Sequence, residues 1–280
     1  MNNDLKIRLI ELAIAEDIGN GDHTSLASIP SSATNKAELK VKDNGIIAGV
    51  DIAKIIFDRL MPGHKIEIFM KDGDKMKPGD IAFTIEGNTQ KLLQAERLVL
   101  NFMQRMSGIA TLTNKYVSKI ADLNTKVLDT RKTTPGLRLI EKEAVKIGGG
   151  YNHRIGLYDM MMLKDNHIDY AGGITKAIEK AVAYQKEKNI SIPIEVEARD
   201  MSEVEEILAT GKADRIMLDN FDYATTRAAV ELINNRCETE SSGGITLDTI
   251  RGYAECGVDF VSVGALTHQI HSLDLSLKAV

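Results

Sequence analysis

The sequence predicts an α/β protein in which an N-terminal α+β unit precedes an incomplete α/β barrel. A chain of 280 residues with 43% hydrophobic side chains can bury one large core or two unequal ones. Up to residue 120, short strands and turns lie between two predicted helices, and after it strand candidates alternate with amphipathic helices. That alternation is typical of βαβ units and therefore of a parallel sheet.

The first part begins with a helix and continues with short strands. Leu5, Leu9, Leu12 and Ala13 form one helical stripe that ends near Ile18. Turns at 72–74 and 78–80 help to separate strands predicted over 36–42, 45–50, 65–70 and 81–86. A long helix follows over about 90–120, with Gly108 as a weak point because glycine disfavours helix interiors.

The second part contains six predicted strands with polar residues at their carboxyl ends. The strands span 126–130, 160–163, 192–197, 215–218, 237–240 and 260–263. In α/β barrels the loops at this face converge on the active site. The residues at or just after these ends are Arg131-Lys132, Lys164-Asp165-Asn166, Glu197, Asp219-Asn220, Ser241-Ser242-Gly243-Gly244 and Gly264-Ala265.

Composition and charge restrict the class of protein. A net charge of -5 provides no basic field for nucleic acid or an anionic membrane. Only Cys237 and Cys256 occur, without CxxC spacing, which argues against zinc and against a disulfide framework. Residues 1–17 lack the apolar core of a secretory signal, and no apolar run approaches the ~20 residues that span a bilayer. We therefore expect a soluble cytoplasmic protein.

Cationic side chains gather after the first two barrel strands. Arg131 and Lys132 end one strand, and His153 and Arg154 follow three glycines that permit close approach of a ligand. Lys164 continues the period of Met160 and Met162, so we expect its ammonium inside the barrel, where a buried lysine needs a partner or a ligand. A solvated strand end and a simple loop are the alternatives for the first two groups.

Carboxylates and glycine loops complement these cations. The alternation over 192–199 places Glu195, Glu197 and Arg199 on a polar face toward the barrel, and Asp219 ends the next strand. Glu197 and Asp219 suit Mg²⁺, and the alternative is a salt bridge from Glu197 to Lys164 or Arg154. The loops after the last two strands often bind phosphate in such barrels. Their residues are Ser242, Gly243 and Gly244, and Gly264, Ala265 and His268.

One face of the long helix is polar. Gln94, Arg97, Asn101 and Arg105 follow each other at three- or four-residue spacing and therefore share this face. From the residues alone, we expect such a face to be solvated.

Taken in order, these segments resemble the quinolinate phosphoribosyltransferase family over nearly the whole chain. The motifs that carry the resemblance are Glu16-Asp17 with Gly21-Asp22 and Thr24, Ala95-Glu96-Arg97 with Asn101, 107–111, 129–138, 148–154, 164–167, 195–197, 218–221, 240–244 and 263–268. Three positions depart from the family pattern: His23 replaces an aliphatic residue, Glu143 replaces an aromatic one, and the strand at 236–240 is unusually polar.

The resemblance implies an N-terminal α/β sandwich domain over 1–112 and an open, incomplete α/β barrel over 113–280, whose last residues pack back on the first domain. It implies the conversion of quinolinate and phosphoribosyl pyrophosphate to nicotinate mononucleotide, carbon dioxide and pyrophosphate, in de novo NAD biosynthesis. It further implies Mg²⁺ and a homodimer in which Arg97 reaches the partner's site, in place of a solvated helix face.

By the same resemblance, Lys132, Lys164, Glu197 and Asp219 are the expected catalytic residues, and Glu197 and Asp219 serve the metal. The expected substrate-binding residues are Arg97, Arg131, Lys132, His153, Arg154, Lys164, Glu197, Asp219, Ser242, Gly243, Gly244, Gly264, Ala265 and His268.

Three other interpretations stay open at this point. A lyase or aldolase would use Lys164 as a Schiff-base amine, which requires a depressed pKa and leaves the paired carboxylates without a role. A non-catalytic sensor of phosphorylated metabolites would bind ligand without releasing pyrophosphate. A related transferase that uses another acceptor base would keep every motif.

Overall fold

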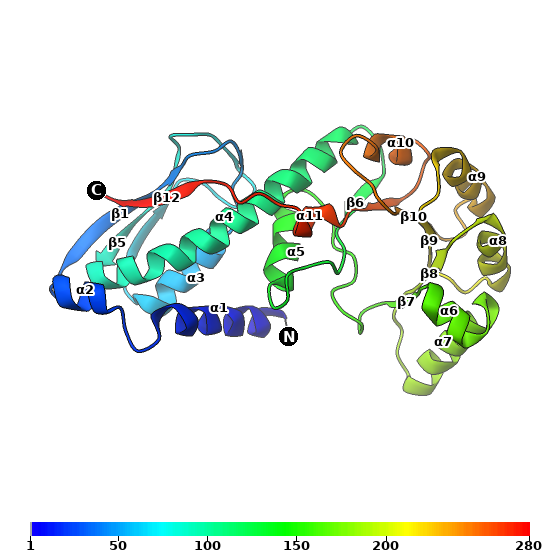
Figure 1. Cartoon of the computed structure of the whole chain (residues 1–280), viewed down its shortest axis with the longest axis horizontal. Coiled ribbons are helices and arrows are strands. Elements are labelled where there is room, and N and C mark those ends of the chain that lie inside the picture. The colour runs from blue at the N-terminus through cyan, green and yellow to red at the C-terminus, as the bar shows by residue number, and fades with distance from the viewer. Residues whose placement is uncertain (1) are drawn as a thin grey trace. The chain divides into compact units, whose positions relative to one another are not determined.

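The computed structural model describes residues 2–280, with side chains from Asp4 onward. The chain forms two compact units (Figure 1). Unit 1 contains Met1–Asn114, Thr133–Gly149 and Leu266–Val280, and unit 2 contains Lys115–Lys132 and Gly150–Ala265. Compared with the expected division after residue 112, the segments 133–149 and 266–280 cluster with the first unit.

Unit 1 is built on an antiparallel sheet with the strand order β12-β1-β5-β3. Paired residues such as Leu39, Phe83 and Leu277 place apolar side chains on one face, because alternate residues of a strand share a face. The strands are β1 (Thr34–Val41), β3 (Lys65–Ile68), β5 (Ile81–Asn88) and β12 (Leu275–Ala279), and β2 (Gly45–Ile46) pairs separately with β4 (Lys75–Met76).

Helices pack on this sheet and complete the predicted α/β sandwich. Phe57 of α3 meets Phe83 of β5 edge to face, with ring centroids 5.9 Å apart. The strand predicted over 45–50 is wrong beyond β2, because Gly49 takes the left-handed conformation (φ 95°) and α3 begins directly after it. The helices are α1 (Asn2–Ile18), α2 (His23–Ser28), α3 (Val50–Leu60), α4 (Thr89–Lys119) and α5 (Arg138–Ile147).

The predicted weak point in the long helix is instead a packing position. Helix α4 runs without a break through Gly108. A Cβ atom at Gly108 would lie 2.2 Å from the carbonyl oxygen of His271, so only glycine lets the C-terminal segment approach the helix this closely. The segment then continues into β12, which pairs with β1.

Unit 2 contains the predicted parallel sheet, with the strand order β6-β11-β10-β9-β8-β7. The first and last strands of this order, β6 and β7, do not pair with each other, so the barrel is open. Each predicted strand is present, with ends shifted by at most two residues. The strands are β6 (Lys126–Leu128), β7 (Met161–Leu163), β8 (Ile194–Ala198), β9 (Arg215–Asp219), β10 (Glu238–Ser242) and β11 (Phe260–Ser262).

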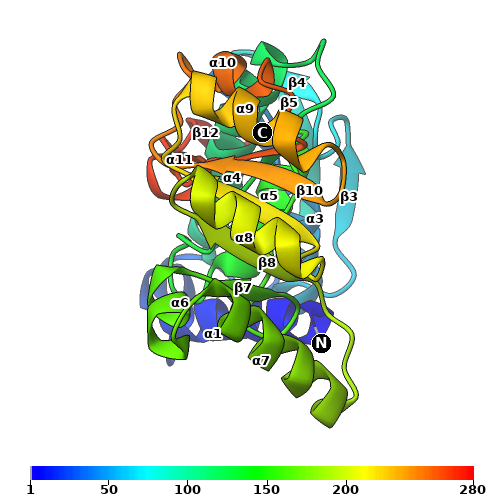
Figure 2. The ribbon, with the colours of Figure 1, turned by 90° about the vertical axis from the view of Figure 1, so that its right-hand side faces the viewer.

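Helices cover the outer face of this sheet, and Figure 2 shows α7, α8 and α9 lying side by side over it. Outward residues of β8 such as Ile194 and Val196 are therefore buried beneath helices, as expected for βαβ units. The helices are α6 (Asp165–Ala171), α7 (Ile174–Lys188), α8 (Met201–Thr210), α9 (Tyr223–Ile233) and α10 (Ile250–Ala254), and α11 (Ala265–His268) begins at the boundary with unit 1. Among residues 2–280, no helix combines the length and apolarity needed to cross a membrane.

Candidate active site

Two arginines, Arg131 and Arg154, lie near each other at the carboxyl end of the barrel. Arg154 is only 8% exposed and donates a hydrogen bond from Nη1 to the carbonyl oxygen of Met160 at 3.2 Å. Its pKa is lowered by burial and then by the charge of Arg131, while Glu195 and Asp159 oppose the shift. Two neighbouring cations at a strand end define a place that favours an anion.

The segment that carries Arg154 is held beside β6. Tyr151 forms a parallel bridge to Leu128, and the buried Asp129 accepts hydrogen bonds from the backbone N–H of His153 at 2.9 Å and from Nδ2 of Asn152 at 2.6 Å. The Asp129 side chain has no exposed surface. This strand-end carboxylate therefore orders the loop instead of meeting a ligand.

Lys164 differs from the buried lysine that the sequence predicts. Its side chain is 45% exposed, and Nζ lies 3.2 Å from Oε2 of Glu197. The strand ends at Leu163, so Lys164 is the N-cap of α6 and leaves the pleat that Met160 and Met162 were expected to set. The alternative of a salt bridge to Glu197 is confirmed as the contact present.

Glu197 and Asp219 end two neighbouring parallel strands. Glu197 is 8% exposed, and burial raises its pKa, with Lys164 lowering it and the charge of Asp219 raising it further. Asp219 is partly exposed and accepts a hydrogen bond from Nδ2 of Asn220 at 2.7 Å. Two carboxylates at the ends of adjacent strands, with oxygens as donors, fit a divalent cation of the Mg²⁺ type.

The glycine loop after β10 packs directly on Asn220. Asn220 adopts a left-handed conformation (φ 57°), and its backbone N–H donates to the carbonyl oxygen of Ser242 at 2.8 Å. A Cβ atom on Gly243 would lie 2.1 Å from Oδ1 of Asn220, and Gly243 itself has φ 105°. Gly244 also has positive φ (58°) but open space around it. The loop shape therefore depends on the first glycine of the pair.

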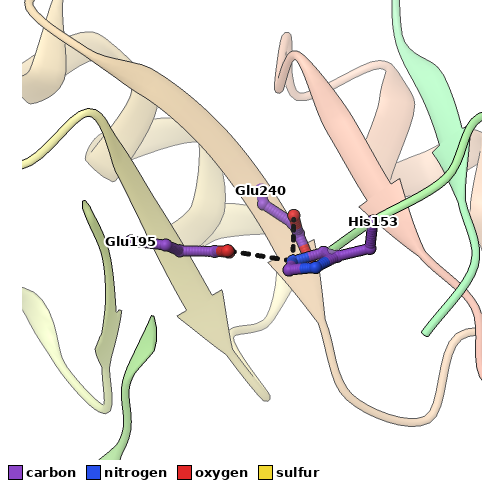
Figure 3. A group of neighbouring side chains, drawn as sticks. All are labelled: His153, Glu195 and Glu240. Atoms are coloured by element: carbon purple, nitrogen blue, oxygen red, sulfur yellow. Dashed lines mark ion pairs between the residues drawn. The ribbon is translucent and has the colours of Figure 1, made fainter. Parts of the chain in front are cut away.

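A buried polar cluster lies below these strand ends, inside the sheet (Figure 3). Nε2 of His153 lies 2.9 Å from Oε2 of Glu195 and 3.5 Å from Oε2 of Glu240. The angles depart from those of a good hydrogen bond, so the contacts are electrostatic ones. Neither carboxyl group is exposed, and burial, the largest cause, raises the pKa of both to about 7.

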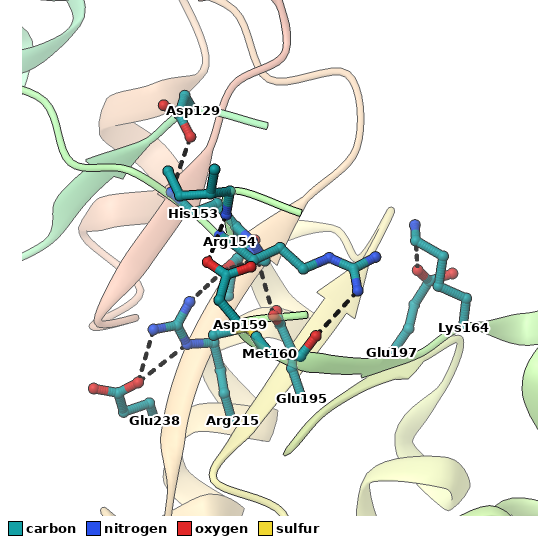
Figure 4. Close-up of polar contacts among 12 residues, drawn as sticks. Asp129, His153, Arg154, Asp159, Met160, Lys164, Glu195, Glu197, Arg215 and Glu238 are labelled. Carbon is teal, nitrogen blue, oxygen red and sulfur yellow. Dashed lines mark hydrogen bonds and ion pairs between the residues drawn. The ribbon is translucent and has the colours of Figure 1, made fainter. Parts of the chain in front are cut away.

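Arg215 supplies the positive charge of this cluster. Its Nη1 lies 3.0 Å from Oε2 of Glu240, and Nε and Nη2 contact Oε2 of Glu238 at 3.1 and 2.8 Å (Figure 4). The guanidinium stacks on Phe260, 4.0 Å from the ring centroid. Alternation along residues 192–199 predicts Glu195 on the inner face, but no role for Glu195, Arg215 or Glu240 follows from the residues. The unusual polarity of the strand at 236–240 was the signal that pointed to them.

Arg199 departs from the predicted polar face. It lies beyond the end of β8, where Nε contacts Oε1 of Glu203 on α8 at 2.8 Å and Nη1 contacts Asp169 at 3.5 Å. The side chain is half-exposed, so Arg199 braces two helices and does not point into the barrel.

In unit 1, the polar residues of α4 divide into two kinds. Gln94 is buried and Arg105 contacts the buried Glu141 through Nε at 2.9 Å, whereas Arg97 and Asn101 are exposed. The solvated face predicted from the residues therefore holds for these two side chains. His268, predicted with the phosphate loops, is an exposed residue of α11 within unit 1.

Fold and site together define an enzyme on an open α/β barrel that handles a multiply anionic ligand. Residues 22–107 match the N-terminal domain of quinolinate phosphoribosyl transferase, and residues 109–278 match the C-terminal domain. The chain belongs to the quinolinate phosphoribosyltransferase family.

Individual relatives are similar along nearly the whole chain. A chloroplastic nicotinate-nucleotide pyrophosphorylase [carboxylating] of Arabidopsis thaliana is 48% identical, over 98% of this chain and 82% of that protein. The probable enzyme of that name from Bacillus subtilis is 43% identical, over 99% of this chain and 94% of its own length. The crystal structure of NadC from Streptococcus pyogenes has a TM-score of 0.91 at 40% identity, covering 97% of this chain and 95% of that one.

Substitution of Gly243 should disturb the loop after β10, and the neighbouring glycine provides a matched control. In Gly243→Ala the added methyl group collides with Asn220, so we expect the KM for the phosphorylated substrate to rise at least ~10-fold. Gly244→Ala costs only the ~1–2 kcal/mol of a left-handed alanine and should stay within about threefold of wild type. Equal effects of the two substitutions in steady-state kinetics would contradict this account of the loop.

The buried carboxyl groups should make stability depend on pH. Because the pKa of Glu240 is raised from 4.5 to about 7, its stabilising contribution is complete below about pH 4.5 and is lost as pH rises through about 7. Glu240→Gln removes this titration, so between pH 5.5 and 8 wild type should lose about 1–3 kcal/mol more unfolding free energy than the variant. Urea unfolding at both pH values measures the difference, and parallel pH profiles would show that Glu240 does not titrate there.

Proposed function

We propose that this chain transfers a phosphoribosyl group to quinolinate and releases carbon dioxide, forming nicotinate mononucleotide and pyrophosphate in de novo NAD biosynthesis. The observation that carries the proposal is the match to both family domains together with a barrel face that combines paired guanidiniums with paired carboxylates. A plant and a bacterial relative named nicotinate-nucleotide pyrophosphorylase [carboxylating], the latter as probable, are similar over at least 98% of the chain.

The charges of the substrates correspond to the charges of the face. Quinolinate carries two carboxylates, which suit the neighbouring cations Arg131 and Arg154, with Lys132 and Lys164 as further cations. The glycine loops at 242–244 and 264–265 offer backbone N–H groups to phosphate. Lys164 stands beside Glu197, from which it would turn toward an incoming anion. We place His153 in the same site.

Side chains at the strand ends can assist the steps of the proposed reaction. The ring nitrogen of quinolinate attacks C1 of the phosphoribosyl group as the bond to pyrophosphate breaks, through an oxocarbenium-like state that Glu197 and Asp219 stabilise. The resulting pyridinium accepts the electron pair of the C–C bond when the adjacent carboxylate leaves as carbon dioxide, and the ring carbon then takes a proton. Lys132 and Lys164 stabilise the leaving pyrophosphate.

A divalent cation belongs to this proposal. Glu197 and Asp219 would hold Mg²⁺, which neutralises pyrophosphate charge when bound. The chain's own residues supply the remaining positive charge at the strand ends.

We also propose a homodimer in which Arg97 serves the partner's site. The exposed position of Arg97 on α4 supports this, because its guanidinium is available to a second copy of the chain. A cytoplasmic location completes the proposal and is supported by the free thiols of Cys237 and Cys256. The Arabidopsis relative is named chloroplastic, so fractionation of the source cells decides the location.

Quinolinate and nicotinate should be separated sharply as substrates. Release of pyrophosphate and carbon dioxide from quinolinate with phosphoribosyl pyrophosphate and Mg²⁺ tests the proposed function. We expect nicotinate to show at least ~10²-fold lower kcat/KM, because a monocarboxylate leaves cations of the site unpaired, the buried Arg154 among them. Comparable use of nicotinate, or pyrophosphate release only with another base, would reject the substrate assignment.

Subunit exchange tests the contribution of Arg97. Arg97→Ala and Lys164→Ala should each be nearly inactive, and a 1:1 mixture should recover about one quarter of wild-type activity, because half of the dimers are mixed and each holds one intact site. A mixture of Lys164→Ala with Glu197→Ala is the control, since both residues belong to the same barrel and no mixed dimer has an intact site. Recovery in neither mixture would remove Arg97 from the partner's site.

A further inference from the structure

The imidazole of His153 uses both ring nitrogens within the protein. Nδ1 accepts a hydrogen bond from the backbone N–H of Arg154 at 2.7 Å, so the proton of the neutral ring belongs on Nε2. Nε2 is closed to solvent and lies 2.9 Å from Glu195 and 3.5 Å from Glu240. A ligand at the strand ends therefore meets neither nitrogen.

The two carboxyl groups are balanced electrically by what already surrounds them. Burial is the largest cause that raises the pKa of both groups to about 7, and the charge of Glu195 raises the pKa of Glu240 further, so the surroundings disfavour two ionised carboxylates here. Arg215 adds one positive charge at Glu240, 3.0 Å away. His153, Glu195 and Glu240 lie close enough together to hold a metal ion, but the Nε2 proton and the Arg215 guanidinium already supply positive charge beside the two carboxyl groups.

The imidazole ring of His153 in turn fixes the position of the Arg154 backbone. The hydrogen bond to Nδ1 fixes the backbone N–H of Arg154, and Asp129 fixes that of His153 at 2.9 Å. Beyond Arg154, Asp159 accepts hydrogen bonds from the N–H groups of Ile155 and Gly156 at 2.7 and 2.9 Å. The guanidinium leaves this braced backbone toward the carbonyl oxygen of Met160, as Figure 4 shows.

We propose that Glu195 and Glu240 are positioning residues that act through His153 to hold Arg154 in place for the dicarboxylate, and that neither ring nitrogen of His153 contacts the substrate. The inference rests on the proposed function and assigns these three residues an indirect part in binding quinolinate. The site binds more tightly because it is preorganised. A guanidinium already held in one direction loses little conformational entropy when it binds its anion.

Kinetics with a matched pair of variants tests the proposal. Glu195→Ala removes the contact to Nε2, so the KM for quinolinate should rise at least about tenfold while the KM for phosphoribosyl pyrophosphate changes less than about threefold. Glu195→Gln keeps an acceptor for Nε2–H and offers an amide N–H to Glu240, so it should stay near wild type. In an Arg154→Ala background, Glu195→Ala should no longer raise the KM for quinolinate, because the guanidinium that Glu195 positions is already absent.

Three kinetic results would overturn the proposal. One is an equal rise in KM for both substrates. Another is an unchanged effect of Glu195→Ala in the Arg154→Ala background. The third is a Glu195→Gln variant as impaired as Glu195→Ala.

Nitrogen NMR of the unmodified enzyme gives a test that depends neither on turnover nor on a variant that folds poorly. With labelled histidine, and with His153→Gln used only to assign the signal, His153 should show the neutral tautomer that carries its proton on Nε2. An imidazolium at pH 7, or one equivalent of a divalent metal bound to His153, would overturn the inference. If this signature is found but quinolinate is not consumed, the proposed substrate fails and the positioning of Arg154 stands.

Discussion

Charged side chains inside the six-stranded sheet are the constraint on which the rest of unit 2 depends. Glu195, Arg215 and Glu238 lie in register on neighbouring strands and therefore share the inner face at one level. Removal of the buried Arg215 costs about 3–5 kcal/mol, because it leaves the buried Glu195 and Glu240 without their cation. A slip of one residue in β8 would exchange these side chains with Ile194 and Val196, so the polar layer fixes register as firmly as the apolar layers do.

Along the inner face, the exposure of charged side chains increases from the middle of the strands to their carboxyl ends. Glu195 and Glu240 have no exposed surface, Glu197 is 8% exposed, and the Lys164 side chain is 45% exposed. The inner carboxyl groups lie against His153 and Arg215, whereas at the ends the charge of Arg131 disfavours the charged form of Arg154. A ligand therefore gains most at the ends, where it relieves repulsion that the fold leaves in place.

The sequence predicted most of the fold because its signals are local. Apolar runs bounded by turns located the six barrel strands to within two residues. Helix α3 was not predicted, because it lies in an apolar stretch where the patterns of strand and helix are hard to separate. Burial of Lys164 and the inward direction of Arg199 were wrong for one reason: both follow the last paired residue of a strand. Alternation predicts a direction only while the pleat continues.

The buried cluster could not be assembled from the sequence, since its contacts join residues that are far apart along the chain, such as Arg215 and Glu240. Its presence was nevertheless visible as polarity in a strand that neighbours on both sides should bury. A central parallel strand is normally apolar throughout, so a glutamate there requires a partner from another strand or loop. In this chain the partners are Arg215 on the adjacent strand and His153 on the loop that carries Arg154. Glu240, a charged residue in a strand expected to be apolar, thus connects the core through His153 to the loop that carries Arg154.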